Sequence, residues 1–131
     1  MFGESGGHMA ATTVLGQRTK TRLAGRNSAD YGYPILLSNL VAQLDGAPCV
    51  ARGAVNNAGN VARTKGMLRR AFETQLDGAG FSFVEILTMC PTGWFIETEK
   101  APDYLEDNLA SVHVTGVLKD TPAPTTQGPG K

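Results

Sequence analysis

The most distinctive feature of the hydrophobic pattern is a short apolar run from Phe83 to Met89. The run is rich in β-branched and aromatic residues, which is typical of a strand buried on both faces of a parallel sheet. Pro91 cannot donate a backbone hydrogen bond and favours an extended conformation for Cys90, so the strand is expected to end there. The pattern therefore places the Cys90 thiol at the carboxyl end of a central strand, where open α/β sheets bind ligands.

Two helices and another strand are predicted before this run. Pro34 suits the first turn of one helix. Its apolar face would comprise Leu36, Leu37, Leu40, Val41 and Leu44. Residues 48–55 read as a strand, and Asn60 is the expected cap of a longer helix. The apolar positions of that longer helix are Val61, Leu68, Phe72 and Leu76. The succession of strand, helix and strand predicts a βαβ unit with parallel strands.

A helix from about Pro102 to Leu109 and an edge strand from Ser111 to Leu118 complete the predicted elements. The fold class is therefore α/β, with a mostly parallel sheet flanked by helices. These elements occupy residues 34–119. Residues 1–33 form a polar segment rich in Gly and Thr, and residues 120–131 are expected to form a flexible tail because they offer no apolar anchor.

The composition of the chain argues against several classes of function. The chain has 131 residues, enough for one domain, and its 12 basic and 12 acidic residues balance, which argues against nucleic acid or an anionic membrane as partner. No apolar run reaches the roughly 20 residues of a membrane span. The two cysteines, Cys49 and Cys90, lack CxxC spacing, which argues against a disulfide scaffold and favours the cytoplasm.

Two short motifs carry candidate chemistry. Ser5, Gly6 and Gly7, followed by Thr12 and Thr13, could cradle a phosphate with backbone N–H groups and hydroxyls, or could simply form a turn. Cys90 could ligate a metal or an iron–sulfur cluster, act as a nucleophile, or be a small buried residue. The residue types alone leave these alternatives open.

Charged residues inside the predicted elements have simpler interpretations. Arg63, Lys65, Arg69 and Arg70 are expected to form the solvated face of the long helix. Glu85 lies within the apolar strand, and a buried carboxylate needs a partner. Arg52 on the neighbouring predicted strand is the natural candidate.

Taken together, these segments resemble a known family, the thiamine-diphosphate-binding β subunit of 2-oxoacid:ferredoxin oxidoreductases. The similarity lies in the order Gly-x-Ser-Gly-Gly-x-Met-Ala-x-Thr-Thr, then Leu15-Gly16-Gln17 and Gly25-Arg26. It continues in residues 50–55, residues 80–85 and the turn Cys90-Pro91-Thr92-Gly93-Trp94. The resemblance covers about residues 1–119.

The resemblance implies roles for matched positions. Met1 and Gly3 would lie at the end of the strand whose backbone helps to hold Mg²⁺. Ser5, Gly6 and Gly7 would lie against the diphosphate of thiamine diphosphate, so that residues 1–33 form a cofactor-proximal segment. Cys90 would be one of the four cysteine ligands of a [4Fe–4S] cluster.

The same resemblance implies oxidative decarboxylation of a 2-oxo acid, transfer of the acyl group to coenzyme A and passage of electrons to ferredoxin. The implied partners are an α subunit and further oxidoreductase subunits, and we expect an oligomer because an exposed half-fold rarely stays monomeric.

The chain also departs from the family pattern. Glu4, His8, Ala11 and Asn56 stand where the family usually has other residues, and Glu4 adds a negative charge near the diphosphate. The CxxC motif, the third cysteine and the magnesium-binding Gly-Asp-Gly segment are absent. We therefore interpret the chain as the C-terminal half of such a subunit, inactive alone. Two alternatives are a non-catalytic scaffold or binding fragment of the same fold that has lost its cofactors, and an unrelated α/β nucleotide-binding domain.

Overall fold

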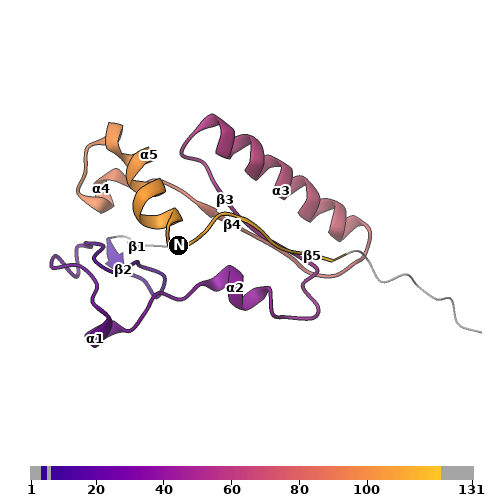
Figure 1. Cartoon of the computed structure of the whole chain (residues 1–131), viewed down its shortest axis with the longest axis horizontal. Coiled ribbons are helices and arrows are strands. Elements are labelled where there is room, and N and C mark those ends of the chain that lie inside the picture. Colours follow the sequence, from indigo (N-terminus) through magenta and orange to yellow (C-terminus); the bar gives the residue numbers. More distant parts are fainter. Residues whose placement is uncertain (1–3, 6, 122–131) are drawn as a thin grey trace, which may run out of the picture.

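The computed structural model describes residues 4–5 and 7–121 of the chain (Figure 1). The helices and strands that precede the first long helix are β1 (Glu4–Ser5), β2 (His8–Met9), α1 (Ser28–Tyr31), α2 (Leu37–Val41) and β3 (Cys49–Ala54). They are followed by α3 (Ala58–Leu76), β4 (Ser82–Leu87), α4 (Pro91–Trp94), the 3₁₀ turn η1 (Thr98–Lys100), α5 (Ala101–Tyr104), the π-helix η2 (Leu105–Ala110) and β5 (Gly116–Asp120). The predicted tail, residues 120–131, lies almost wholly outside the described residues, and the division of the chain into segments stays a prediction.

The main sheet has three strands in the order β4-β3-β5. β3 and β4 are parallel and in register from Cys49 opposite Ser82 to Ala54 opposite Leu87. β5 runs antiparallel to β3, with a register shift between Val50 and Ala51. The predicted α/β class and the parallel βαβ unit β3-α3-β4 are confirmed, and the antiparallel β5 makes the sheet mixed.

The position of β4 within the sheet differs from the prediction. Among the described residues β4 lies at one edge and β3 occupies the centre. Every residue of β3 is buried, whereas most of β4 is half-buried. In the sequence, the small residues of β3 indicate a strand less clearly than the apolar run of β4. In the fold they suit the central position, because the long helix α3 packs closely on them.

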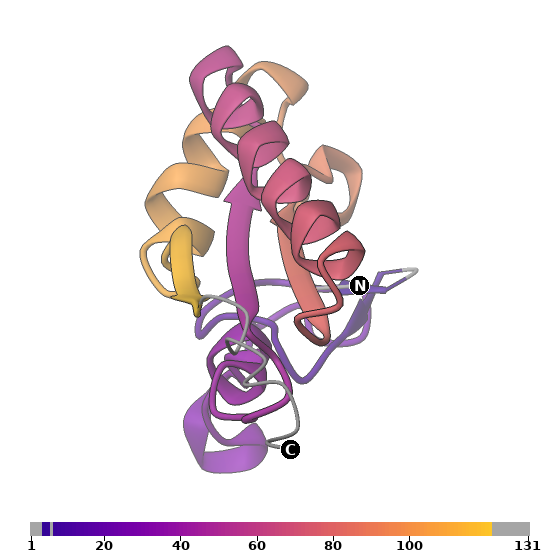
Figure 2. The ribbon, with the colours of Figure 1, turned by 90° about the vertical axis from the view of Figure 1, so that its right-hand side faces the viewer.

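Helices cover the two faces of this sheet. α3 lies on one face and α2 on the other, with the strands between them (Figure 1). Figure 2 shows α3 running along β3 and β4. None of the helices in the described part of the chain is long and apolar enough to cross a membrane.

The long helix packs with a polar and small-residue face, not with its predicted apolar face. Its buried residues are Asn60, Thr64, Ala71 and Thr74. A Cβ at Gly53 of β3 would lie 2.8 Å from Thr64 Cγ2, so the missing side chain lets the helix approach the strand. Phe72 and Leu76 are 68% and 87% exposed. The helical spacing was predicted correctly, but the face of α3 predicted to be buried was wrong.

The ends of several elements also differ from the prediction. The N-cap of α3 is Asn57, whose side chain accepts from the N–H of Asn60, and Asn60 is itself buried in the first turn. α2 is shorter than the predicted 34–44 helix. The last strand begins at Gly116 rather than Ser111, because residues 111–113 form a turn that buries His113.

Arg52 and Glu85 form a buried ion pair between β3 and β4, as expected. Arg52 Nε donates to Glu85 Oε2 at 2.9 Å, and both side chains are at most 2% exposed. The Ser38 hydroxyl of α2 donates to the same carboxylate oxygen. The remaining guanidinium nitrogens donate to Val114 O and Asn39 Oδ1, both at 3.0 Å. This network joins α2, the sheet and the segment before β5.

Arg26 organises the segment before α2 from within. Its guanidinium is buried and donates to six backbone carbonyl oxygens. The acceptors are those of Ala10, Ala11, Thr13, Tyr31, Gly32 and Tyr33. A segment with little regular structure cannot satisfy its own carbonyls by a ladder, so one charged side chain takes that role. Arg26 is therefore an internal support of this segment.

Candidate functional site

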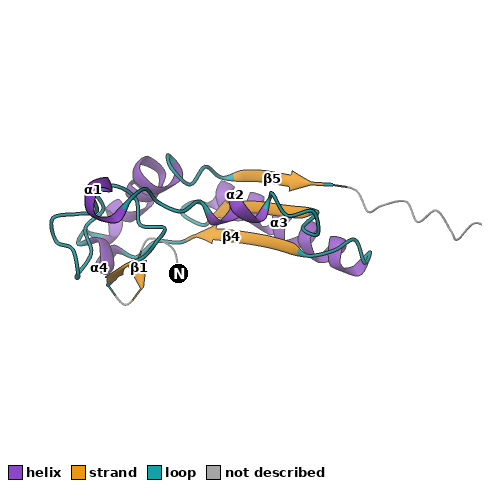
Figure 3. Cartoon of the chain, turned by 90° about the horizontal axis from the view of Figure 1, so that it is seen from below, coloured by secondary structure: helices purple, strands orange, loops and turns teal. Residues whose placement is uncertain are grey.

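The predicted site lies at the end of the molecule where β3 and β4 terminate. Both strands point towards the end that carries α4, α1 and the hairpin β1-β2 (Figure 3). A hydrophobic cluster supports this end from inside. Its buried members are Ala54, Leu87, Trp94, Ala101, Leu105 and Leu109. The fold therefore brings the Gly/Thr-rich segment and the turn after Cys90 to the same edge of the sheet.

The proposed diphosphate loop forms a tight antiparallel hairpin. Ser5 of β1 pairs with His8 of β2, and Glu4 pairs with Met9. Gly7 in the turn is buried and has φ +86°, a conformation that residues with a Cβ rarely adopt. Of the other residues assigned to this site, Met1, Gly3 and Gly6 lie outside the described residues, so their predicted roles stay predictions.

The structure places Lys20 against this hairpin. A Cβ at Gly7 would lie 2.8 Å from Lys20 Cγ, and the Lys20 N–H donates to the Gly7 carbonyl at 2.7 Å. The lysine stem therefore covers the glycine, and the flexible side chain carries its ammonium group beside the hairpin. The sequence analysis missed Lys20, because only folding of the irregular segment places it next to a motif thirteen positions earlier.

The hairpin is held to the same segment by threonine hydroxyls. The Met9 N–H donates to Thr21 Oγ1 at 3.0 Å, and the Thr19 and Thr21 hydroxyls lie 3.4 Å apart. Thr13 accepts from the Ala10 N–H through Oγ1 at 2.8 Å. Thr12 and Thr13 are both buried, so these hydroxyls support the loop from behind rather than facing solvent.

Cys90 follows β4 and is the N-cap residue of α4, with Pro91 in the first turn. It is half-buried and packs against the hydrophobic cluster. The two cysteines form no disulfide. Within residues 4–5 and 7–121, no three His, Cys, Asp or Glu residues are grouped to hold a metal ion. A [4Fe–4S] cluster needs about four thiolates. The described residues of this chain therefore do not suffice for such a cluster, and Cys90 could supply one ligand.

His113 links the C-terminal part to the Thr12-Thr13 loop. Its Nε2 lies 2.9 Å from the Thr12 carbonyl oxygen and must carry the proton, because a carbonyl can only accept. His113 is 2% exposed, and its Nδ1 has no hydrogen-bond partner among the described residues. Burial lowers the pKa of His113, opposed by the bond to Thr12. The contact therefore places a proton on Nε2, and burial favours the neutral form of the imidazole.

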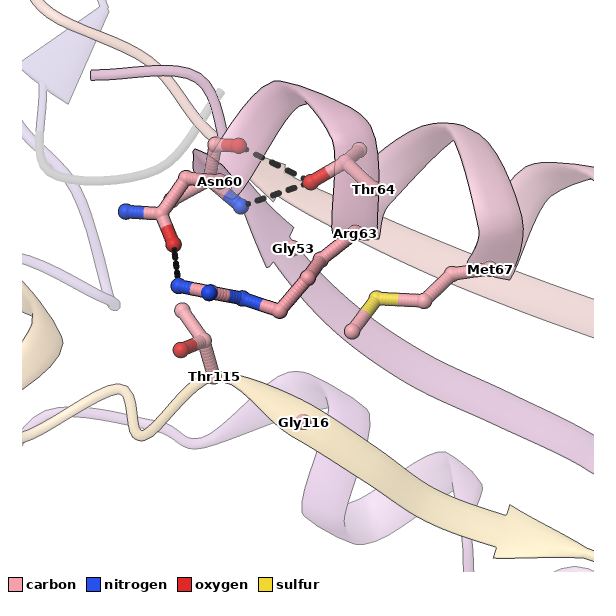
Figure 4. A pocket seen from close by; sticks show the side chains of 8 residues that line it. Gly53, Asn60, Arg63, Thr64, Met67, Thr115 and Gly116 are labelled. Carbon is pink, nitrogen blue, oxygen red and sulfur yellow. Dashed lines mark hydrogen bonds between the residues drawn. The ribbon is translucent and has the colours of Figure 1, made fainter. Parts of the chain in front are cut away.

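A small pocket of about 90 Å³ lies between the start of α3 and β5 (Figure 4). Arg63 donates to Asn60 Oδ1 across its rim. Thr64 donates to the Ala54 carbonyl at 2.8 Å and accepts from the Ala54 N–H at 3.0 Å. These groups satisfy one another, so the pocket is a packing feature of the helix–strand contact.

A larger pocket of about 330 Å³ lies between residues 14–18 and residues 94–96. It joins the Leu15-Gly16-Gln17 motif to the turn that follows Cys90. Trp94 is buried, whereas Phe95 is 43% exposed. The two motifs lie nearly eighty positions apart and meet only through the fold.

Comparison with known proteins found two related subunits. The chain is 31% identical, over 125 residues and 95% of its length, to the ketoisovalerate oxidoreductase subunit VorA of Methanothermobacter thermautotrophicus, and this alignment covers 26% of that protein. It is 33% identical, over 109 residues and 83% of its length, to the same subunit of Methanothermobacter marburgensis, covering 23% of that protein. The chain therefore spans about a quarter of the length of these curated relatives.

No protein-family model matches the chain. No solved structure gives a significant match either. The chain is thus homologous, over most of its length, to one segment of an oxidoreductase subunit that is named for a 2-oxo acid.

Proposed function

We propose that this chain is a cofactor-proximal part of a 2-oxoacid:ferredoxin oxidoreductase and corresponds to the C-terminal part of its thiamine-diphosphate-binding β subunit. The assembled enzyme would oxidatively decarboxylate a 2-oxo acid to an acyl-CoA and pass the electrons to ferredoxin. The single observation that carries the proposal is the similarity of 95% of the chain to VorA. The motif order from the Gly-Gly loop to the Cys-Pro turn agrees with it.

Thiamine diphosphate would supply the electron sink for decarboxylation, and this chain would hold one side of the cofactor. The hairpin of β1 and β2 turns at Gly7, and Lys20 adds a positive charge beside it. A glycine turn with a lysine beside it suits a diphosphate. Mg²⁺ would require ligands beyond those of the described residues.

Cys90 would contribute one thiolate of a [4Fe–4S] cluster, while a partner polypeptide contributes the others. Its place after β4 and next to α4 puts the thiol near the pocket-forming turn rather than inside the sheet. Further oxidoreductase subunits, ferredoxin, coenzyme A and the 2-oxo acid are the proposed partners. The cytoplasm is the proposed compartment.

The test is co-expression of this chain with a polypeptide that carries the remaining cysteines and the magnesium-binding segment, followed by anaerobic purification. We expect the complex to contain iron and the Cys90→Ser variant to lose most of it. Cys49→Ser is the matched control, because Cys49 is buried in β3 and should leave the iron content unchanged. Equal iron in the parent complex and Cys90→Ser would contradict the ligand assignment.

The same complex tests the diphosphate site. Lys20→Met keeps the aliphatic stem over Gly7 and removes the charge, so thiamine diphosphate should bind about tenfold more weakly, as expected for one charge-assisted contact. Lys65→Met on the exposed face of α3 is the control and should bind it normally. A complex that forms but retains neither iron nor thiamine diphosphate would favour the non-catalytic scaffold.

A further inference from the structure

The flank of the molecule beside β4 presents an unpaired strand edge. β4 lies at one end of the strand order β4-β3-β5, and among the described residues only β3 pairs with it. Every residue of β3 is buried, whereas most residues of β4 are half-buried. Parallel strands are normally covered on both sides by neighbouring elements, so the outer edge of β4 is open to a further strand.

β4 lacks the features that protect exposed sheet edges from pairing. Residues 82–87 contain no lysine and no proline, and the one charged residue, Glu85, is already paired with Arg52 inside the sheet. The opposite edge strand, β5, carries Lys119 and Asp120, and a register shift interrupts its pairing with β3. Charged residues and irregular pairing are usual means of protecting an edge. Of the two edges, β4 is therefore the one suited to pairing.

An apolar stripe of α3, formed by Leu68, Phe72 and Leu76, lies above this edge. Arg70 pairs with Asp120 of β5 at 2.8 Å, so the flank of α3 that carries Arg70 faces β5. Leu68 and Phe72 lie two positions before and after Arg70, and two positions turn a helix by about 200°. They therefore lie on the flank towards β4. Leu68 is half-buried, whereas Phe72 and Leu76 are 68% and 87% exposed.

The strand adds two aromatic rings to the same flank. Phe81, directly before β4, is 54% exposed, and Phe83 within β4 is half-buried, with the ring centres 6.5 Å apart. Ser82 between them donates to the Ala71 carbonyl of α3 at 3.1 Å, so the alternation of a strand turns the two phenylalanines to the other face of the sheet. The flank therefore presents apolar side chains on both sides of the open strand.

We propose that a second copy of this chain docks on this flank, with the two β4 strands paired antiparallel about a two-fold axis. Such a contact places each surface opposite itself, so like charges near the axis would repel and apolar side chains are favoured. β4 brings no unpaired charge to the axis, because Glu85 is neutralised by Arg52. The two three-stranded sheets join into one continuous sheet.

The spacing of the elements fits this arrangement. α3 contacts both β3 and β4. With strands about 4.8 Å apart, the two copies of α3 would lie side by side with their axes about 10 Å apart, the distance of packed helices. The flank is about 20 Å long and roughly 20 Å high, from the length of β4 and one helix layer above it. A dimer would thus bury on the order of 800–1,000 Å² in total, about what a specific interface needs.

The arrangement leaves the candidate site free. Because the two β4 strands run antiparallel, their carboxyl ends, each followed by Cys90, point to opposite ends of the dimer. The inference uses only β4, α3 and the edge between them. It therefore does not depend on the proposed oxidoreductase function.

Sedimentation of the full 131-residue chain tests the proposal. Between about 1 μM and about 1 mM, the range of weak to moderate affinities, we expect the 13.8 kDa monomer to convert to a species of twice that mass. The β4 amides that do not bond to β3 should exchange with solvent more slowly in the dimer. A chain that stays monomeric over this range would overturn the proposal and leave the flank to a different polypeptide. Open-ended oligomers would also overturn it, because a two-fold contact uses each β4 edge once.

Variants locate the contact. Phe72→Glu should weaken the dimer about tenfold or more, because it removes two rings and places two carboxylates near the axis. Val117→Glu adds the same charge at an exposed apolar position of β5 and should leave the dimer unchanged. Far-UV circular dichroism checks folding, and the more exposed Leu76→Glu repeats the test if Phe72→Glu does not fold. Equal dimerisation of Phe72→Glu and the parent chain would refute the proposal, and loss of the dimer in Val117→Glu alone would place the contact at β5 instead.

Discussion

At the scale of single residues, buried charged and polar groups decide how this chain holds together. The Glu85 carboxylate is paired with Arg52 and accepts from Ser38, so one oxygen of a buried acid is satisfied by two elements. Removing either partner of such a pair typically costs about 3–5 kcal/mol, because the other charge stays buried. His113 is a second buried polar side chain, and its protonation state affects the stability of the fold.

The stability of the chain should depend on pH through His113. Its folded pKa lies below its ordinary value because the imidazole is buried. The unfolded chain therefore binds more protons than the folded chain once the pH falls below about 6.5. The stability that this group contributes is present above that pH, and we expect the free energy of unfolding to decline over the range below it.

Urea titrations across that range measure the effect. In His113→Gln an amide N–H can still donate to the Thr12 carbonyl, and the decline should become shallower. The exposed His8 provides the control, and His8→Gln should retain the decline. A pH profile that is the same in His113→Gln and the parent chain would rule out His113 as the titrating group.

At the scale of elements, the contact between α3 and β3 depends on small residues. Thr64 bonds both the N–H and the carbonyl of Ala54, and this places its side chain directly over Gly53. The helix therefore turns Asn60, Thr64, Ala71 and Thr74 to the sheet and leaves larger apolar residues outside. Close approach of a helix to a strand is possible where no Cβ intervenes.

Gly53→Ala should therefore destabilise the fold. The new methyl group would lie 2.8 Å from Thr64 Cγ2, and Thr64 cannot move away without losing its bonds to β3. Overpacking of this kind costs about 1–3 kcal/mol. Gly66→Ala is the matched control, because a Cβ there meets nothing within 4 Å and the change should stabilise α3 by about 0.5–1 kcal/mol. Chemical denaturation of both variants gives the comparison, and equal stability of Gly53→Ala and the parent would contradict the packing argument.

At the scale of the whole molecule, specific hydrogen bonds join the irregular segment before α2 to the rest of the fold. His113 bonds Thr12, and the Ile35 N–H bonds the Ala11 carbonyl at 3.0 Å. Within the segment, Arg26 satisfies six carbonyl oxygens. The segment should thus open locally when Arg26 is lost, while the sheet stays folded.

Hydrogen exchange measures whether the segment opens while the sheet stays folded. Arg26→Met leaves buried carbonyls without a donor, at about 1–3 kcal/mol each, so amides in residues 10–33 should exchange about tenfold faster or more. Amides of β3 and β4 should exchange as before. Arg22→Met is the control, because Arg22 is partly exposed and its ion pair with Asp30 lies at the surface. Faster exchange throughout the sheet in Arg26→Met would show instead that segment and sheet unfold together.

The hydrophobic pattern alone determined the α/β class, the parallel pair of strands, the end of β4 before Pro91 and the partner of Glu85. These features follow from local rules: period, β-branching, proline and the cost of an unpaired buried carboxylate. The motif order by itself also pointed to a 2-oxo-acid oxidoreductase subunit, and the chain is homologous to one segment of such a subunit.

Only the tertiary structure decided which strand is central, which face of α3 is buried and what holds the irregular segment. It also decided the candidate site, because Lys20 lies against Gly7, and residues 14–18 and 94–96 line one pocket. The bonds of six carbonyls to Arg26 and the close approach of Thr64 to Gly53 are of the same kind. They arise from packing between distant segments, which periodicity along a single chain does not encode.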